Sequence, residues 1–307
     1  MTDSATNHKV PHPSAIETVG LGKRYRRGWA LRDSSFRLPA GRMCALVGPN
    51  GAGKTTLLSL AADLVEPTTG TIRLAGHHPG SREARHGTAF LSQHKALYPR
   101  FRVREILRMG QELNPTWNQD TAEAVVEAGG IPMDARVGTL SGGQSTRVAF
   151  ALALGKRPRL MLLDEPMADL DPLVRHQMTD LLRTEARRNG STVVMSSHLV
   201  SELSNACDYL VLVNNGQVRL AGEVDLLLDQ HRQITAAATA DGYDVIATTG
   251  QGAERMTLVR TDEGSPPDET LRAPTLEELV LGYLGAPDTV PLITPSARVA
   301  AESEVSA

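Results

Sequence analysis

The amino-acid sequence predicts an α/β fold with a mainly parallel central sheet, and two observations lead to that prediction. Short apolar runs alternate with helical patterns from residue 15 to about residue 230, as in domains whose strands are joined by crossover helices. Several of these runs are apolar throughout and lie beside turn signals, which is typical of strands that helices cover on both faces. The clearest runs are Met43–Val47, Leu160–Leu163, Thr192–Met195 and Tyr209–Val213.

An inserted helical lobe is expected within this domain, at about residues 94–155. Between Gln93 and Leu140 the hydrophobic pattern turns helical, with Val103–Gly110 and Thr121–Gly129 as its clearest segments. Because strand patterns lie on both sides of these segments, we interpret them as an insertion into the α/β domain.

Residues 231–286 are predicted to form a small C-terminal α+β appendage. Tyr243–Thr249 and Arg255–Thr261 alternate between apolar and polar residues as strands do. After them, Thr275-Leu-Glu-Glu278 is a capping box that opens a short helix.

Composition restricts the class of protein. A formal net charge of -3, with 22% charged residues, argues against bulk attraction to nucleic acid or to anionic lipid. Both cysteines lie in apolar stretches, which fits a reducing cytoplasm. Residues 1–14 are polar and lack the apolar core of a signal peptide, and no apolar run is long enough for a membrane helix. Residues 1–14 are expected to be a disordered leader, and residues 287–307 a disordered tail.

A phosphate-binding loop is predicted at Gly48-Pro-Asn-Gly-Ala-Gly-Lys-Thr55, which matches G-x-x-x-x-G-K-[ST]. The apolar run Met43–Val47 leads into it, and an expected helix, Thr56–Asp63, follows it. Glycines let the backbone wrap closely around phosphates, and the helix start adds partial positive charge. Lys54 is expected to reach the β- and γ-phosphates of a nucleotide, and the Thr55 hydroxyl to bind Mg²⁺. The alternative is a glycine-rich turn that only joins strand to helix.

Two carboxylates, Asp164 and Glu165, follow the apolar run Leu160–Leu163. A carboxylate at the end of a buried strand needs a partner, and Mg²⁺ or its water shell supplies one, so Asp164 is expected on the metal side. Glu165 points in a different direction and is expected to orient or deprotonate an attacking water. A salt-bridged pair at a strand end is the alternative, which the phosphate-binding loop disfavours.

The segment Leu140-Ser-Gly-Gly-Gln144 resembles the signature motif of ABC-transporter ATPases at every position. Further motifs agree with that family in order and spacing over residues 20–222. Phe90-Leu-Ser-Gln93 resembles the Q-loop, Met167–Pro172 the D-loop and Ser196-Ser-His198 the H-loop. The resemblance implies a P-loop NTPase core with an antiparallel β lobe and an inserted helical lobe.

The resemblance also implies a role for each motif. The implied catalytic residues are Glu165, His198, Gln93 and Lys54. The implied metal-side residues are Thr55, Gln93 and Asp164. The implied ATP-binding residues are Tyr25, which would stack on adenine, and Gly48, Pro49, Asn50, Gly51, Ala52, Gly53, Lys54, Thr55 and Thr56. In a dimer, the opposite subunit would contribute further ATP-binding residues, Ser141, Gly142, Gly143 and Gln144. Asp169 and Asp171 would take part in communication between the two subunits.

The function implied is ATP hydrolysis that energises a separate membrane permease, with ATP and Mg²⁺ as cofactors. A second cassette, identical or paralogous, would complete the dimer at the cytoplasmic face of the membrane. The alternative is a soluble ABC-type ATPase that acts on ribosomes or DNA. Such proteins hold two cassettes or a long coiled coil, whereas only about 46 residues separate Gln93 from Leu140 here. Nucleic acid is therefore not expected as a partner.

The direction of transport is expected to be export. Gln93–Pro99 and Ala273–Leu281 resemble the ATPases of bacterial multidrug or antibiotic exporters. An importer ATPase is the alternative. In this family the transported substrate binds the permease, so this sequence does not predict it.

Overall fold

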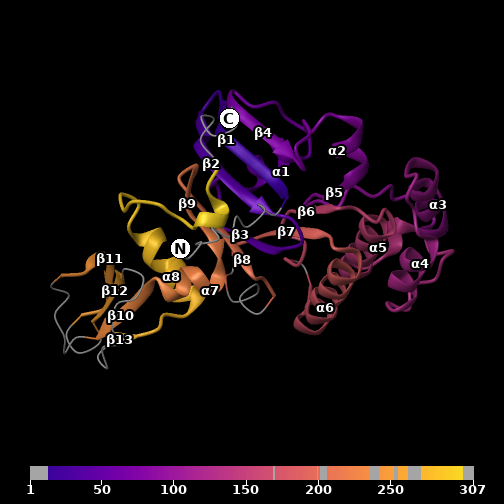
Figure 1. Ribbon diagram of the computed structural model, residues 1–307. Helices are drawn as coiled ribbons and strands as arrows, with labels where there is room; N and C mark the ends of the chain where they lie inside the picture. Colours follow the sequence, from indigo (N-terminus) through magenta and orange to yellow (C-terminus); the bar gives the residue numbers. More distant parts are fainter. Residues whose placement is uncertain are drawn as a thin grey trace, which may run out of the picture.

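The computed structural model describes residues 13–168, 170–198, 200, 206–235, 242–251, 255–261 and 271–299. In this part of the chain the central sheet has the strand order β14-β9-β8-β3-β7-β6-β5 (Figure 1). Its strands are β3 (Met43–Val47), β5 (Thr88–Leu91), β6 (Leu160–Leu163), β7 (Thr192–Ser197), β8 (Tyr209–Asn214), β9 (Gln217–Glu223) and β14 (Leu292–Ile293). Neighbouring strands are parallel except β8 and β9, which form an antiparallel pair. The expected α/β class and the four buried strands are thus confirmed.

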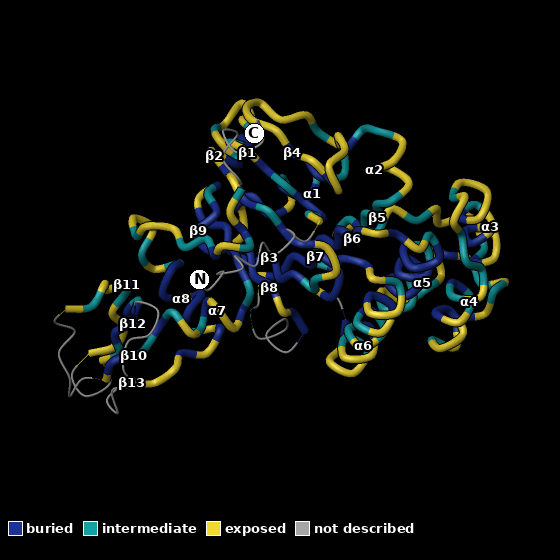
Figure 2. Tube along the Cα trace, viewed as in Figure 1, coloured by how far each residue is buried: buried dark blue, intermediate teal, exposed yellow. Residues whose placement is uncertain are grey.

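Both faces of the central sheet are covered, as the uniformly apolar strands predicted. Successive residues of β3 contribute alternately to two hydrophobic cores, Cys44 and Leu46 to one, Ala45 and Val47 to the other. Figure 2 shows the central strands as buried along most of their length. A strand with both faces in a core has no solvated face, so its sequence does not alternate.

The first core lies under an antiparallel β lobe. This lobe has the strand order β2-β1-β4, formed by β1 (Ser14–Tyr25), β2 (Gly28–Pro39) and β4 (Thr69–Leu74). Helix α1 (Lys54–Ala61) contributes Leu57, Leu58 and Leu60 to the same core. Because β1 begins at Ser14, the last residue of the expected leader is ordered; the Ser14 hydroxyl accepts a hydrogen bond from Arg37 at 3.0 Å. Residues 1–12 lie outside the described part of the chain.

The second core extends into the helical lobe, which lies beside the β5 edge of the sheet (Figure 1). Its helices are α3 (Val103–Leu113), α4 (Gln119–Glu127) and α5 (Gly142–Gly155), with the short helix η1 (Val137–Thr139) before α5. Trp117 packs closely between two glycines, since a Cβ on Gly110 or Gly155 would lie 2.6 or 2.7 Å from its ring. Two further helices, α2 (Arg82–Gly87) and α6 (Pro172–Asn189), flank the central sheet.

The appendage is a small sheet packed on a helix. Its strand order is β11-β12-β10-β13, formed by β10 (His231–Thr235), β11 (Asp244–Thr249), β12 (Met256–Arg260) and β13 (Leu271–Arg272). The expected capping box is present at the start of α8 (Leu276–Gly285), where Thr275 and Glu278 exchange hydrogen bonds. Helix α7 (Val224–Asp229) joins this unit to β9. Gly282 lets α8 approach the sheet, because a Cβ there would lie 2.4 Å from the Leu258 side chain.

The expectation of a disordered tail is wrong for residues 287–299, and residues 300–307 of that tail lie outside the described part of the chain. After α8 the chain returns to the central sheet, where β14 pairs with β9 and the short helix η4 (Pro295–Ala297) buries Ala297 completely. The close approach needs glycine in β9, since a Cβ on Gly222 would lie 2.2 Å from the Thr294 side chain. This segment is ordered because it pairs with an edge strand and buries an apolar side chain.

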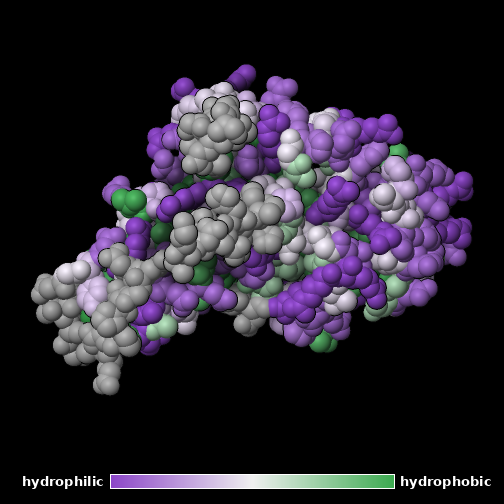
Figure 3. Space-filling view, viewed as in Figure 1, coloured by the Kyte–Doolittle hydropathy of each residue, from purple (hydrophilic) through white to green (hydrophobic). Residues whose placement is uncertain are grey.

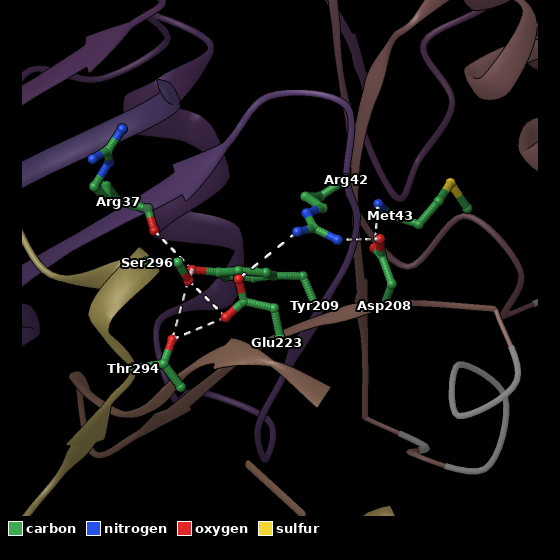
Figure 4. A network of polar contacts seen from close by, with 8 residues as sticks. All are labelled: Arg37, Arg42, Met43, Asp208, Tyr209, Glu223, Thr294 and Ser296. Atoms are coloured by element: carbon green, nitrogen blue, oxygen red, sulfur yellow. Dashed lines mark hydrogen bonds and ion pairs between the residues drawn. The ribbon is translucent and has the colours of Figure 1, made fainter. Parts of the chain in front are cut away.

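A polar network around Glu223 holds the segment that contains Thr294 and Ser296 against the central sheet (Figure 4). The Glu223 carboxylate accepts hydrogen bonds from the hydroxyls of Ser296, at 2.6 Å, and Thr294, at 3.2 Å. A guanidinium nitrogen of Arg42 lies 3.8 Å from its other oxygen. Burial opposes the charge of Glu223, but the hydrogen bonds from Ser296, the backbone and Thr294, together with Arg42, outweigh burial and lower its pKa.

This network predicts a pH dependence of stability. Because the pKa of Glu223 is lowered by folding, its contribution is complete above the ordinary glutamate pKa of about 4.3 and is lost as the pH falls through the folded value. Glu223→Gln is expected to lower the unfolding free energy at pH 7 by about 1–2 kcal/mol, and the difference from the parent should shrink toward pH 3. Denaturant unfolding between pH 7 and pH 3 measures this difference in unfolding free energy. The control is Glu66→Gln, which changes an exposed glutamate. If Glu223→Gln destabilises the protein as much at pH 3 as at pH 7, the stabilisation does not come from the charge of Glu223.

In the part of the chain that the structure describes, no helix combines the length and hydrophobicity needed to cross a bilayer. The face of the molecule in Figure 3 is largely hydrophilic.

Candidate active site

The predicted nucleotide-site residues follow the ends of neighbouring parallel strands. The phosphate-binding loop follows β3, Gln93 follows β5, Asp164 and Glu165 follow β6, and His198 follows β7. The carboxyl ends of parallel strands meet at one edge of a sheet, and ligands of open α/β sheets bind outside that edge. Strand order therefore brings together segments that are more than 100 residues apart in the sequence.

The phosphate-binding loop depends on glycine at two crowded positions. Gly48 has φ 153° and Gly53 has φ 114°, values that residues with a side chain avoid. A Cβ would lie 2.1 Å from the Val213 carbonyl oxygen at Gly48, and 2.4 Å from the Ala30 carbonyl oxygen at Gly53. Helix α1 starts directly after Gly53 with no side chain capping its first turn. Its first N–H groups are therefore placed to bind an anion.

Lys54 is buried and holds its ammonium group over the loop. Its Nζ donates to the carbonyl oxygens of Gly48, at 2.7 Å, and Pro49, at 3.2 Å. It also lies 3.7 Å from Oε1 of Glu165. Burial lowers the pKa of Lys54, and the carboxylates of Glu165 and Asp164 oppose that effect. The ammonium group thus lies between the loop and the carboxylates that follow β6.

The two carboxylates after β6 take different directions, as expected. Asp164 is buried, and its Oδ1 accepts a hydrogen bond of 2.7 Å from the hydroxyl of Ser196. Glu165 has φ 44°, in the left-handed region, and its side chain extends toward Lys54 and His198. Nδ1 of His198 lies 3.2 Å from Oε2 of Glu165. Lys54, Glu165 and His198 therefore form one polar group, with Asp164 beside it.

The remaining predicted residues of this site differ in exposure, and most of them are exposed. Thr55 is exposed at the start of α1, Thr56 is half-buried, and Gln93 is exposed beyond the end of β5. Tyr25 ends β1 with 46% of its surface exposed, and Nζ of Lys23 lies 5.4 Å from the centre of its ring. Of the other loop residues, Pro49, Asn50 and Gly51 are exposed and Ala52 is buried.

The signature segment forms a second helix start that can bind an anion. Ser141 caps α5, its hydroxyl oxygen accepting from the N–H of Gln144 at 3.2 Å while the Gln144 side chain accepts from the N–H of Ser141 at 3.0 Å. The hydroxyl hydrogen of Ser141 is not used in this pair. Gly142 and Gly143 follow without side chains, and a Cβ on Gly142 would meet nothing within 4 Å. This helix start belongs to the helical lobe, whereas Lys54 starts α1 in the core.

The D-loop residues are placed only in part. Asp171 caps α6, and its carboxylate accepts from the N–H groups of Leu173, at 3.1 Å, and Val174, at 3.0 Å. This capping role of Asp171 was not predicted from the sequence. Asp169 lies outside the described residues.

Ser196 is the polar residue at the site whose contacts sequence reasoning missed. It belongs to the segment assigned to the H-loop but received no role of its own. The available signal was a hydroxyl near the end of a buried strand that pairs with the strand directly before Asp164.

The fold and the site define a P-loop NTPase. Comparison with known proteins is more specific: the family described as ABC transporter matches residues 31–168. The aliphatic sulfonates import ATP-binding protein SsuB 3 of Pseudomonas syringae pv. tomato is 38% identical over 258 residues, which cover 83% of this chain and 89% of that protein. This chain belongs to the ABC transporter family as an ATP-binding subunit, and it is an ATPase.

Solved structures agree with this membership. The ATP-binding subunit of an ABC transporter shares 26% identity at a TM-score of 0.64, over 70% of this chain and 92% of its own. A dimeric ATP-binding cassette bound to ADP and Pi shares 22% identity at a TM-score of 0.62, over 68% of this chain and 98% of its own, and supports the fold alone.

The expectation of export finds no support in these comparisons, because the named relative is an import protein. The two segments that suggested export belong to the cassette and its appendage, and the relative that shares most of this chain is named as an import protein. The motifs that identify an ATPase therefore do not determine the direction of transport.

Proposed function

We propose that this ATPase hydrolyses Mg²⁺-bound ATP at composite sites in a dimer and thereby drives a separate permease. One observation carries the proposal. Lys54, at the start of α1, lies 3.7 Å from Glu165, and the other carboxylate oxygen of Glu165 contacts His198. Asp164, which directly precedes Glu165, also acts on the charge of Lys54, and the order of the parallel strands brings these residues to one edge of the sheet.

Lys54 is proposed to hold the β- and γ-phosphates. In the structure its ammonium group donates to the carbonyl oxygens of Gly48 and Pro49 inside the loop. ATP would replace these two acceptors with phosphate oxygens, which are stronger partners because they are charged. Tyr25 offers an exposed ring on which adenine can stack.

Glu165 is proposed to orient or deprotonate the attacking water. Its carboxylate lies next to the ammonium group that would hold the γ-phosphate, and His198 contacts its other oxygen. His198 is proposed to donate a hydrogen bond to the γ-phosphate as negative charge develops on it, and its contact with Glu165 supports this role. Gln93, beyond β5, is proposed to contact the water or the metal and to link the site to the helical lobe.

The residues present fit a magnesium ion that arrives with ATP. In the described part of the chain no cluster of three or more His, Cys, Asp or Glu side chains could hold a metal alone. Mg²⁺ in nucleotide sites takes only one or two protein oxygens in addition to phosphates and water. The Thr55 hydroxyl and the Asp164 carboxylate, directly or through water, would supply them. The ion would neutralise charge on the phosphates.

The signature helix start is proposed to complete the site of a second cassette. Ser141, Gly142 and Gly143 present N–H groups and a hydroxyl, yet this helix start belongs to a different lobe from Lys54. A head-to-tail dimer would place each such start against the γ-phosphate held by the partner. Asp171, which caps α6, and Asp169, which follows Glu165 in the sequence, are proposed to communicate between the two cassettes.

The permease would be a separate membrane protein, with this subunit bound at its cytoplasmic face. The name of the sulfonate-importing relative favours import as the direction. The competing class is an ATPase of ribosomes or DNA, which would have no permease.

Cell fractionation and reconstitution test the coupling to a membrane protein. We expect the tagged chain to sediment with membranes and to leave them in mild detergent as a complex with an integral membrane protein. In proteoliposomes the uptake of a labelled alkanesulfonate should require ATP on the side that carries this subunit, and complexes with Glu165→Gln should show none. Sedimentation with ribosomes and no bound membrane protein would overturn the coupling, and ATP-driven extrusion would overturn import alone.

A further inference from the structure

We propose that Ser196 is a positioning residue that holds Asp164 and Glu165 in different directions. The inference rests on the roles proposed above for these two carboxylates. Because the carboxylates of these adjacent residues point in different directions, one can serve the metal side and the other the attacking water.

The contacts of Ser196 are suited to this task. Its side chain is buried, with 1% of its surface exposed. Its hydroxyl donates to Oδ1 of Asp164 at 2.7 Å and accepts from the backbone N–H of Glu165 at 2.8 Å. A serine hydroxyl has a single hydrogen, so donation to Asp164 orients the hydroxyl and leaves its lone pairs for Glu165. One small group therefore contacts the side chain of one residue and the backbone of the next.

The second contact matters because the backbone of Glu165 is in an unfavourable conformation. Its φ of 44° is uncommon for a residue with a side chain and needs support from its surroundings. The hydrogen bond from its N–H to Ser196 supplies part of that support. With this backbone, the Glu165 carboxylate contacts Lys54 and His198, whereas that of Asp164 contacts Ser196.

The sheet places Ser196 where the hydroxyl is needed. Strands β6 and β7 are parallel, and Leu163 pairs with Met195. The residues that follow this pair are therefore Asp164, just after β6, and Ser196, in β7. An apolar residue at this position would leave the partly buried N–H of Glu165 and a buried oxygen of Asp164 without these partners, which is costly.

Steady-state kinetics of Ser196→Ala test the inference. We expect kcat to fall about tenfold or more, because a displaced Glu165 no longer lies against the water. The KM for ATP should change less than about threefold, because Lys54 and the phosphate-binding loop keep their contacts. Ser196→Thr keeps the hydroxyl and should stay within about threefold of the parental kcat.

Amide hydrogen exchange gives a readout that does not depend on turnover. The N–H of Glu165 should exchange slowly in the parent and in Ser196→Thr, and faster in Ser196→Ala. The matched control is Ser191→Ala, which removes another buried hydroxyl, one that donates to the Pro158 carbonyl at 2.6 Å just before the same strand. This control should leave kcat and the exchange of Glu165 unchanged.

The outcomes separate the inference from the proposed function. Parental kcat or unchanged Glu165 exchange in Ser196→Ala would overturn the positioning role. A folded Ser196→Thr that loses kcat as Ser196→Ala does would also overturn it, because the hydroxyl would then not be responsible. Near-normal hydrolysis by Glu165→Gln would instead overturn the proposed role of Glu165.

Discussion

Glu165→Gln is expected to reduce ATP hydrolysis by about a hundredfold or more while ATP binding persists, because a general base contributes at least that factor and an amide cannot serve as one. The substitution keeps the size of the side chain and leaves the contacts of Lys54 with Gly48 and Pro49 in place. ATP that binds but is not consumed should hold two cassettes together. Size-exclusion chromatography with ATP should show a dimer for this variant and a shorter-lived one for the parent.

Two further measurements complete this test. Nucleotide titration should give the variant an affinity for ATP close to that of the parent. Gln119→Ala, a change in α4 of the helical lobe, should leave hydrolysis unaltered. If Glu165→Gln hydrolyses ATP at a near-normal rate, Glu165 does not act on the water.

Lys54→Ala is expected to weaken both ATP binding and hydrolysis. The ammonium group is buried and placed to exchange its carbonyl acceptors for phosphate oxygens, so its removal takes away charge-assisted hydrogen bonds. Such bonds are worth about 1.5–3 kcal/mol, which corresponds to about 10- to 100-fold in affinity. Isothermal titration of the variant with ATP measures this loss.

Lys156 is a matched control for Lys54. It is a lysine whose Nζ donates to two backbone carbonyls, those of Arg85 at 2.8 Å and Thr88 at 2.6 Å, and burial lowers its pKa. Because those contacts lie in α2 and at the start of β5, away from its carboxyl end, Lys156→Ala should keep the parental ATP affinity. Equal losses for the two variants would mean that Lys54 acts on the fold and not on phosphate.

Much of the fold and site was predictable because the relevant signals are local. A strand buried on both faces must be apolar at every position, as Met43–Val47 is, and a phosphate-binding loop needs glycines at Gly48 and Gly53. The capping box at Thr275 is likewise contained in four successive residues. Each of these features depends on residues that are adjacent in the sequence, so a short sequence pattern predicts it.

The features that could not be predicted depend on contacts between distant residues. The hydroxyl of Ser196 contacts a carboxylate 32 residues away, and that of Ser296 contacts Glu223 from 73 residues away. Neither pair of residues forms a short sequence motif. Ser196 was therefore given no role, and residues 287–299 were expected to be disordered. Strand order decides both contacts, through the pairing of β6 with β7 and of β14 with β9.

Mixing two inactive variants tests the composite site most directly. Lys54→Ala and Ser141→Arg each damage both sites of a homodimer, but their heterodimer holds both lesions in one site and leaves the other intact. If one intact site can hydrolyse ATP, random mixing should restore about a quarter of parental hydrolysis, and activity should rise with the fraction of heterodimer. Heterodimers that form and bind ATP yet remain as inactive as either variant would contradict a site shared between two cassettes.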